Sequence, residues 1–189
     1  ADYSLAVTVE PNYPQAFFGR GNVWIDTGDV DRALADYGVA IRLDPNYADA
    51  YTNRGNIWSA KKDYDRAVAD YSEAIRLAPQ DSDPLSNRGN VWLMKGEFDR
   101  AMADYNAAIR LDPKDYCAIN NRGIVWHAKG DDDRAIADYN EAIRLAPNFA
   151  RAYYNRAVAY GEKGERDRAF ADFDMAQRLD PGLPMASGS

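Results

Sequence analysis

Residues 116–149 read YCAINNRGIVWHAKGDDDRAIADYNEAIRLAPNF, and variants of this stretch recur along the whole chain. The period is marked by prolines that lie 34 residues apart, namely Pro11, Pro45, Pro79, Pro113, Pro147 and Pro181. Aligned on these prolines, the chain contains five complete units, which are residues 14–47, 48–81, 82–115, 116–149 and 150–183. Residues 1–13 precede them and match only the second half of a unit. Self-similarity at such a period is typical of repeat proteins, in which each unit packs mainly against its neighbours.

Each unit contains two segments with helical periodicity, separated by a turn such as Lys129-Gly130-Asp131. Glycine suits a helix stop, and an acidic residue after it can cap the next helix. Apolar or small residues recur on one face of each helix, at positions 4, 8 and 11 of the unit and again in its second half. In residues 116–149 these are Ile119, Gly123 and Trp126, followed by Ala135, Tyr139 and Ala142. We expect the two faces to pack together, with glycine allowing a close approach of the helices.

The order of a large residue, glycine, tryptophan, alanine, tyrosine, alanine and proline over 34 residues resembles the tetratricopeptide repeat (TPR) family. The resemblance covers residues 14–183; Lys62 departs from it in one turn, and Ala157 and Tyr160 replace glycine and tryptophan in the last unit. It implies an all-α, right-handed superhelix of helix pairs whose first helices line a concave face. Residues 1–13 would then be the second helix of an incomplete repeat, and residues 184–189 a tail or linker.

The composition argues against several classes of function. A formal net charge of -7 and a pI near 4.7 do not suit a nucleic-acid binder, because phosphate neutralisation requires clustered Lys and Arg. The chain also lacks an apolar run of about 18 residues, so membrane insertion is not expected. Cys117 is the only cysteine, which rules out an internal disulfide and fits a reducing, cytoplasmic compartment.

Catalytic chemistry is not expected either. Cys117 and His127 could suggest a nucleophile and its base, but ten residues of one helix separate them by about 15 Å. With one cysteine and one histidine, a zinc site is equally implausible. The acidic residues recur with the repeat and are interpreted as solvated faces and helix caps. We therefore predict no enzyme activity, no metal site and no cofactor.

Three further ladders follow the repeat. Tryptophan occurs at Trp24, Trp58, Trp92 and Trp126, and this spacing favours core packing over an aromatic cage, which would need converging rings. Position 7 is always arginine, namely Arg20, Arg54, Arg88, Arg122 and Arg156. Position 23 is always aspartate, namely Asp36, Asp70, Asp104, Asp138 and Asp172. We expect each arginine to meet a position-23 carboxylate of its own or the preceding unit; the alternative is a ladder that binds an acidic ligand.

Asparagine dominates the opposite stripe of the first helix, at positions 2, 6, 9 and 13. Position 6 holds Asn53, Asn87, Asn121 and Asn155, broken by Gly19, and position 9 holds Asn22, Asn56 and Asn90, then Ile124 and Val158. Asparagine is a mediocre helix former, so its recurrence needs another cause. Its carboxamide offers a donor beside an acceptor, which matches the N–H and C=O groups of a peptide backbone.

This stripe resembles the asparagine ladder in the TPR region of the O-linked N-acetylglucosamine transferases, which holds extended peptides by their main chain. The resemblance implies a protein-interaction scaffold that binds an extended polypeptide in its groove. The predicted peptide-binding residues are Asn22, Asn53, Asn56, Asn87, Asn90, Asn120, Asn121, Asn155 and Tyr154. If they bind a peptide, replacing Asn87 and Asn121 by alanine should weaken binding and barely change folding. In the alternative, the amides merely bridge neighbouring first helices.

The acidic groove favours a neutral or basic partner. Asp26, Asp49, Asp83 and Glu162 outnumber Arg151 on the groove stripe, and the lysines of a carboxylate clamp are missing from position 5. Two other roles remain open: a structural module with weak end-to-end homo-association, and the substrate-recruiting region of a larger enzyme such as a glycosyltransferase.

Overall fold

The computed structural model describes residues 3–184, and all regular secondary structure in this range is α-helical. The helices are α1 (Tyr3–Val9), α2 (Pro14–Asp26), α3 (Val30–Leu43), α4 (Ala48–Ala60), α5 (Tyr64–Leu77), α6 (Asp83–Met94), α7 (Phe98–Leu111), α8 (Tyr116–Ala128), α9 (Asp132–Leu145), α10 (Ala150–Glu162) and α11 (Arg166–Leu179). The predicted all-α array of five helix pairs preceded by a single helix is therefore confirmed. Residues 185–189 of the expected tail lie outside the described range.

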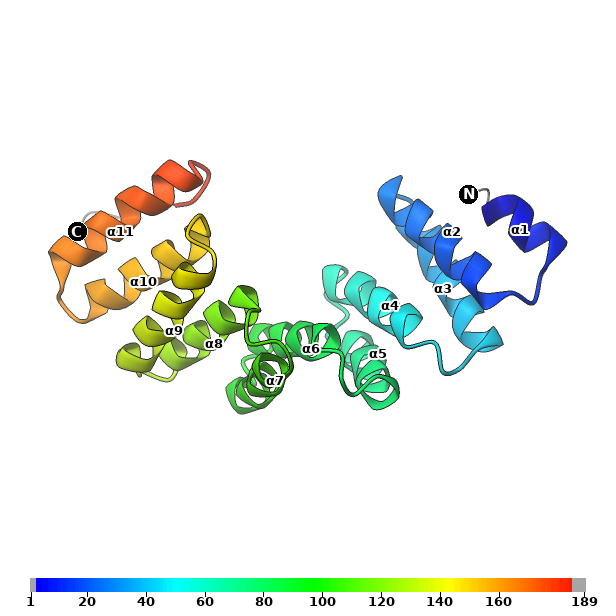
Figure 1. The fold of residues 1–189 in the computed structure, drawn as a ribbon, viewed down its shortest axis with the longest axis horizontal. Coiled ribbons are helices and arrows are strands. Elements are labelled where there is room, and N and C mark those ends of the chain that lie inside the picture. Colours follow the sequence, from blue (N-terminus) through cyan, green and yellow to red (C-terminus); the bar gives the residue numbers. More distant parts are fainter. Residues whose placement is uncertain (1–2, 185–189) are drawn as a thin grey trace. The chain divides into compact units, whose positions relative to one another are not determined.

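The chain divides after Val91 into two compact units, which we describe separately. In the first unit, α2 pairs with α3 and α4 pairs with α5; in the second, α8 pairs with α9 and α10 with α11 (Figure 1). Consecutive pairs also touch, through α3 and α4 in the first unit and through α9 and α10 in the second. Within each unit, the helix pairs thus pack against their sequence neighbours, as expected of a repeat array.

The turn inside each pair uses a left-handed backbone position. Gly130 has a φ of 78° after α8, a conformation that strains L side chains. The next residue, Asp131, caps α9 by accepting a hydrogen bond from the backbone N–H of Arg134 at 3.0 Å. In the second repeat Lys62 adopts a φ of 61° at the equivalent position. That turn is therefore made without glycine, at a cost of roughly 1 kcal/mol.

The expected close approach of paired helices is confirmed at the position-8 glycine. Tyr139 of α9 is 1% exposed, and a Cβ atom placed on Gly123 of α8 would lie 2.6 Å from its ring. The same stacking joins Tyr37 to Gly21 and Tyr71 to Gly55. Burial in this layer raises the pKa of Tyr139, because the phenolate would lose its hydration.

The first helices also bury position 3 and, from α4 onward, position 10, which the sequence pattern did not reveal as core; in α2, Val23 at position 10 is exposed. In α8 these are Ala118 and Val125, with exposures of 1% and 0%. Helix α8 contacts both α7 before it and α9 after it, so it buries a wider face than three positions can cover. The predicted stripe at positions 4, 8 and 11 accounts for packing against one neighbouring helix only, so it contains fewer residues than the observed core.

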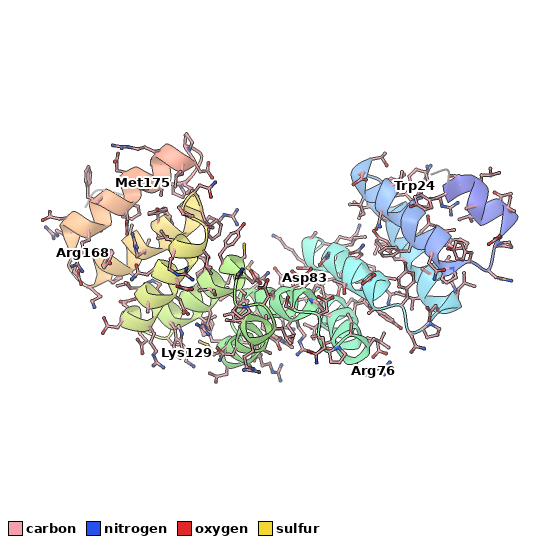
Figure 2. The ribbon with its side chains drawn as sticks, viewed as in Figure 1. Trp24, Arg76, Asp83, Lys129, Arg168 and Met175 are labelled. Atoms are coloured by element: carbon pink, nitrogen blue, oxygen red, sulfur yellow. The ribbon has the colours of Figure 1, made fainter. Side chains whose placement is uncertain are left out.

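The tryptophans are partly buried packing residues. Trp24, whose place on α2 is labelled in Figure 2, packs against a hydrophobic cluster of the first repeat, and Trp58 and Trp126 do so in theirs. The guanidinium of Arg134 covers the ring of Trp126 at 3.7 Å from its centroid. Each ring is thus held between the core and an arginine of its own repeat, which supports the packing interpretation over a cage.

Candidate polypeptide-binding site

The asparagines of the first unit form hydrogen bonds between neighbouring first helices. Asn53 of α4 donates from Nδ2 to Oδ1 of Asn22 in α2, at 3.0 Å. One repeat further, Asn87 of α6 donates from Nδ2 to Oδ1 of Asn56 in α4, at 3.2 Å. Positions 6 and 9 of successive repeats are therefore joined, so these amides do bridge neighbouring first helices.

A buried tyrosine fixes the orientation of each position-9 amide. The hydroxyl of Tyr37 donates to Oδ1 of Asn22 at 2.6 Å, and that of Tyr71 donates to Oδ1 of Asn56 at 2.7 Å. Burial raises the pKa of both phenols, so each remains a protonated donor. Each Oδ1 atom accepts two hydrogen bonds, which fills both of its lone pairs.

Part of the hydrogen-bonding capacity of these four amides is unused. Within the described chain, Nδ2 of Asn22 and of Asn56 donates no hydrogen bond, and Oδ1 of Asn53 and of Asn87 accepts none. We call these four residues the asparagine row. Position 9 of the row offers N–H donors and position 6 offers carbonyl acceptors, and none of the four residues is fully buried. The row can therefore bind groups of both kinds, as an extended backbone presents them.

The asparagine row borders a cavity of about 620 Å³ formed by α2, α3 and α4. Its polar lining includes Asn22, Asn53 and Asn56, and its apolar lining includes Ile25, Val30 and Ile57. Such a volume lies within the ~300–1,000 Å³ typical of ligand pockets. The apolar lining was not predicted from the sequence, because residue type at the position of Ile25 varies from unit to unit.

The break in the asparagine stripe at Gly19 has a structural cause. Tyr3 of α1 lies over Gly19, so that a Cβ atom there would be 2.3 Å from the tyrosine ring. In the 34-residue register Tyr3 is equivalent to Tyr37, which lies over Gly21 of its own repeat. Helix α1 precedes the first pair without a first helix of its own in the described range, and its tyrosine packs on α2 instead. An asparagine at this position would collide with the ring.

The second unit has a different hydrogen-bond pattern. Asn155 of α10 donates from Nδ2 to Oδ1 of Asn120 in α8, at 3.0 Å, and Asn120 in turn donates to Oδ1 of Asn121 at 3.0 Å. Ile124 occupies position 9 here and offers no acceptor, so position 5 replaces it. Asn120 is 2% exposed. The structure thus places it in the interior, where it supports Asn155 and does not face solvent.

The remaining predicted site residues are partly buried. Tyr154 packs edge-on against Phe173 of α11, with ring centroids 5.5 Å apart, so only part of its surface is accessible. Phe18 of α2 likewise packs against another ring, that of Tyr47, with ring centroids 4.8 Å apart. Asn90 lies half-buried on α6.

The arginine ladder is structural. Two parallel hydrogen bonds of 2.7–2.8 Å join Arg20 to Asp36, Arg54 to Asp70, Arg122 to Asp138 and Arg156 to Asp172, always within one repeat. In Arg122 the third guanidinium nitrogen reaches the preceding repeat, where Nη1 donates to Oδ1 of Asn106 at 2.9 Å, and Arg156 does the same with Asn140. The hydrogen bond to Asp138 raises the pKa of Arg122, so the guanidinium stays charged. These contacts confirm the ion-pair interpretation and leave little capacity for an acidic ligand.

Comparison with known families identifies the repeats. Profiles described as TPR repeat match residues 21–59 and 125–164, and tetratricopeptide repeat profiles match residues 48–81, 82–115 and 150–182. The chain is a tetratricopeptide repeat protein. It thus belongs to a family of protein-interaction scaffolds. No curated protein matches the sequence.

Several solved structures share the fold. The structure of YrrB, described as a TPR protein with an unusual peptide-binding site, has a TM-score of 0.78 and 25% identity, over 96% of this chain and 94% of that one. One structure of MamA has a TM-score of 0.77 and 26% identity, over 85% of this chain and 94% of that one. PilF of Pseudomonas aeruginosa has a TM-score of 0.81 at 18% identity, over 90% and 78% of the two chains, and so supports the fold alone. No helix in residues 3–184 of this TPR protein is long and apolar enough to span a membrane.

Proposed function

We propose that this TPR protein holds an extended polypeptide along the first helices of its repeats, with the asparagine row hydrogen-bonding the peptide backbone. The observation that carries the proposal is the pattern of unused amide atoms, in which position 9 offers donors and position 6 offers acceptors. The proposed contact residues are Asn22, Asn53, Asn56, Asn87 and Asn90 in the first unit, and Asn121, Asn155 and Tyr154 in the second. Asn120 acts from the interior as a support for Asn155.

The hydrogen bonds among the asparagines favour this role. An amide that is already held in one orientation loses less rotamer freedom when a ligand binds, which lowers the entropic cost of binding. Tyr37 and Asn53 hold the Asn22 side chain in this way, and its two N–H groups remain available. The network that bridges the helices therefore also preorganises the donors for a peptide carbonyl.

Two further observations support a polypeptide ligand. YrrB, at 25% identity, is described as having a peptide-binding site. The groove stripe of the first unit exposes Asp26, Asp49 and Asp83, which would attract neutral or basic segments and repel acidic ones. Main-chain recognition would make the specificity broad, with side-chain preferences added by the cavity beside the row.

Aspartate substitutions test the proposal without breaking the network. In Asn22→Asp with Asn56→Asp, each position keeps an oxygen that can accept from its tyrosine and from its bridging asparagine. The substitutions remove only the unused N–H donors and put negative oxygen in their place. We expect the melting temperature to change little. Affinity for an uncharged peptide, selected from a displayed library of unstructured decapeptides on the wild type, should fall about tenfold or more, since each lost hydrogen bond is worth ~0.5–1.5 kcal/mol.

A matched control separates charge from position. Asn46→Asp with Asn148→Asp introduces the same two charges at exposed loop residues outside the row and should leave the Kd of the selected peptide unchanged. The proposal fails if the two aspartates in the row have no larger effect than this control. It also fails if no uncharged decapeptide can be selected on the wild-type protein.

A further inference from the structure

The cavity of the first unit combines an apolar lining with a charged rim. Ile25 and Val30 from one repeat and Ile57 and Ala60 from the next line it, and Ile25 is 40% exposed. Apolar surface in such a hollow favours an aliphatic or aromatic group that can displace water from it. The asparagine row forms part of the same lining, so a peptide on the row can insert a side chain here.

The charge at the rim is unbalanced. Lys61 lines the cavity, but its Nζ atom lies 3.1 Å from a carboxylate oxygen of Asp31, which neutralises it. Asp26 also lines the cavity, is exposed, and forms no ion pair with any described residue. The Asp26 carboxylate also acts on Tyr37, which lines the same cavity. Burial raises the pKa of the Tyr37 phenol, and the negative charge of Asp26 raises it further. The net potential of the cavity is therefore negative.

We infer that this cavity takes one basic side chain, lysine or arginine, of the bound polypeptide. The aliphatic stem would lie against Ile25, Val30 and Ile57, and the cationic end would meet Asp26 at the rim. The inference rests on the proposed function, which it extends from backbone recognition to a side-chain preference. An acidic side chain would be repelled by Asp26, and an uncharged aliphatic one would leave this carboxylate unused.

The combination of an apolar lining with an acidic rim is particular to this repeat. The residues equivalent to Ile25 and Asp26 are His127 and Ala128 on α8, and Gly161 and Glu162 on α10. No other repeat therefore places a large aliphatic residue directly before a carboxylate at this point of the first helix. A basic residue of the ligand would fix the register of the peptide at α2 and α4.

Two small probes with the same stem test the inference directly. N-acetyl-lysine N-methylamide and N-acetyl-norleucine N-methylamide differ by the ammonium group, and either can be titrated into isotope-labelled protein. We expect both to shift the side-chain amide resonances of Asn22, Asn53 and Asn56. The lysine derivative should bind about two- to fivefold more tightly, the range set by exposed ion pairs. The arginine analogue should behave like lysine, and about 1 M salt should remove both preferences.

Substitution of the rim carboxylate completes the test. Asp26→Asn should equalise the lysine and norleucine derivatives, whereas Glu162→Gln, at the same position of α10, should leave the lysine preference intact. The inference is overturned if wild type does not prefer lysine, if Asp26→Asn keeps the preference, or if the shifted resonances lie elsewhere. These failures are distinguishable from failure of the proposed function, because an uncharged decapeptide that depends on the donors of Asn22 and Asn56 would still show backbone binding. Conversely, if the lysine derivative is preferred but no decapeptide binds, the cavity does take a basic side chain and the proposed binding of an extended polypeptide is refuted.

Discussion

Replacing Arg122 by alanine should destabilise the second unit through the charge that it leaves behind. Arg122 donates to both oxygens of Asp138, at 2.8 and 2.7 Å, and its third nitrogen bonds Asn106 of the preceding repeat at 2.9 Å. Asp138 is only 8% exposed, so its carboxylate would lose its partner in a poorly hydrated place. Removing one member of such a pair typically costs ~3–5 kcal/mol.

The structure favours the lower end of that range. The Arg122 side chain is 24% exposed, so water can enter the space that alanine leaves and hydrate the carboxylate in part. We therefore expect a loss of about 3 kcal/mol, or a fall in melting temperature of about 6–12 °C for a chain of this size. Urea unfolding followed by circular dichroism measures it, with hydrogen exchange of α8 and α9 as a local readout in case the array unfolds in stages.

Two comparison variants decide whether the buried charge is the cause. Arg144→Ala removes an exposed partner of Glu141, with arginine and glutamate side chains 66% and 41% exposed, and should cost about 0–1 kcal/mol. Arg122→Met with Asp138→Leu removes both charges together and should recover most of the lost stability. If Arg122→Ala unfolds like Arg144→Ala, or if the double variant is no more stable than Arg122→Ala, the reasoning is refuted.

Other predictions follow from single contacts. Gly38→Ser should stabilise the chain by about 1–2 kcal/mol, because serine is a better helix residue than glycine and can add a hydrogen bond. Nη1 of Arg54 lies 4.0 Å from a Cβ atom placed on Gly38, which is within reach of a serine oxygen. A lower urea midpoint would contradict this prediction. Stability should be complete below about pH 10 and fall above it by about 1.4 kcal/mol per pH unit for each core tyrosine, because burial raises their folded pKa above the unfolded one. These are Tyr37, Tyr71, Tyr105 and Tyr139, and their phenolate absorbance should appear only as the helical signal is lost. Phe170 of α11 is 75% exposed, so light scattering should show concentration-dependent association that Phe170→Glu reduces; a strictly monomeric wild type would disprove it.

Features with local causes were predictable from the sequence. The turn at Gly130 and the cap at Asp131 depend on the backbone and side-chain chemistry of adjacent residues, so their pattern is visible in any single unit. The pairing of Arg122 with Asp138 was predictable for another reason. Both charges recur in every unit at a constant separation, and opposite charges that recur together on packed helices have few other partners.

The partners of the asparagines could not be predicted in the same way. Asn53, for example, bonds Asn22, which lies 31 residues earlier. Whether an amide bonds a neighbouring helix or remains available to a ligand depends on the distance between the first helices of successive repeats. Sequence periodicity does not give this distance. Asn120 and Asn121 illustrate the limit, since a rotation of about 100° between adjacent helical residues puts the first in the interior and leaves the second half-buried.

The helices, their pairing and the stripe of amides were predictable from the sequence, because each of these depends on residue spacing within one 34-residue unit. The position of the cavity, and the amide atoms that remain free, depend on contacts between repeats. Val30 of one repeat and Ile57 of the next line that cavity beside Asp26, although they belong to three different helices. Their proximity is a consequence of how the helix pairs stack, and stacking geometry is set by side-chain packing between repeats that no single unit encodes.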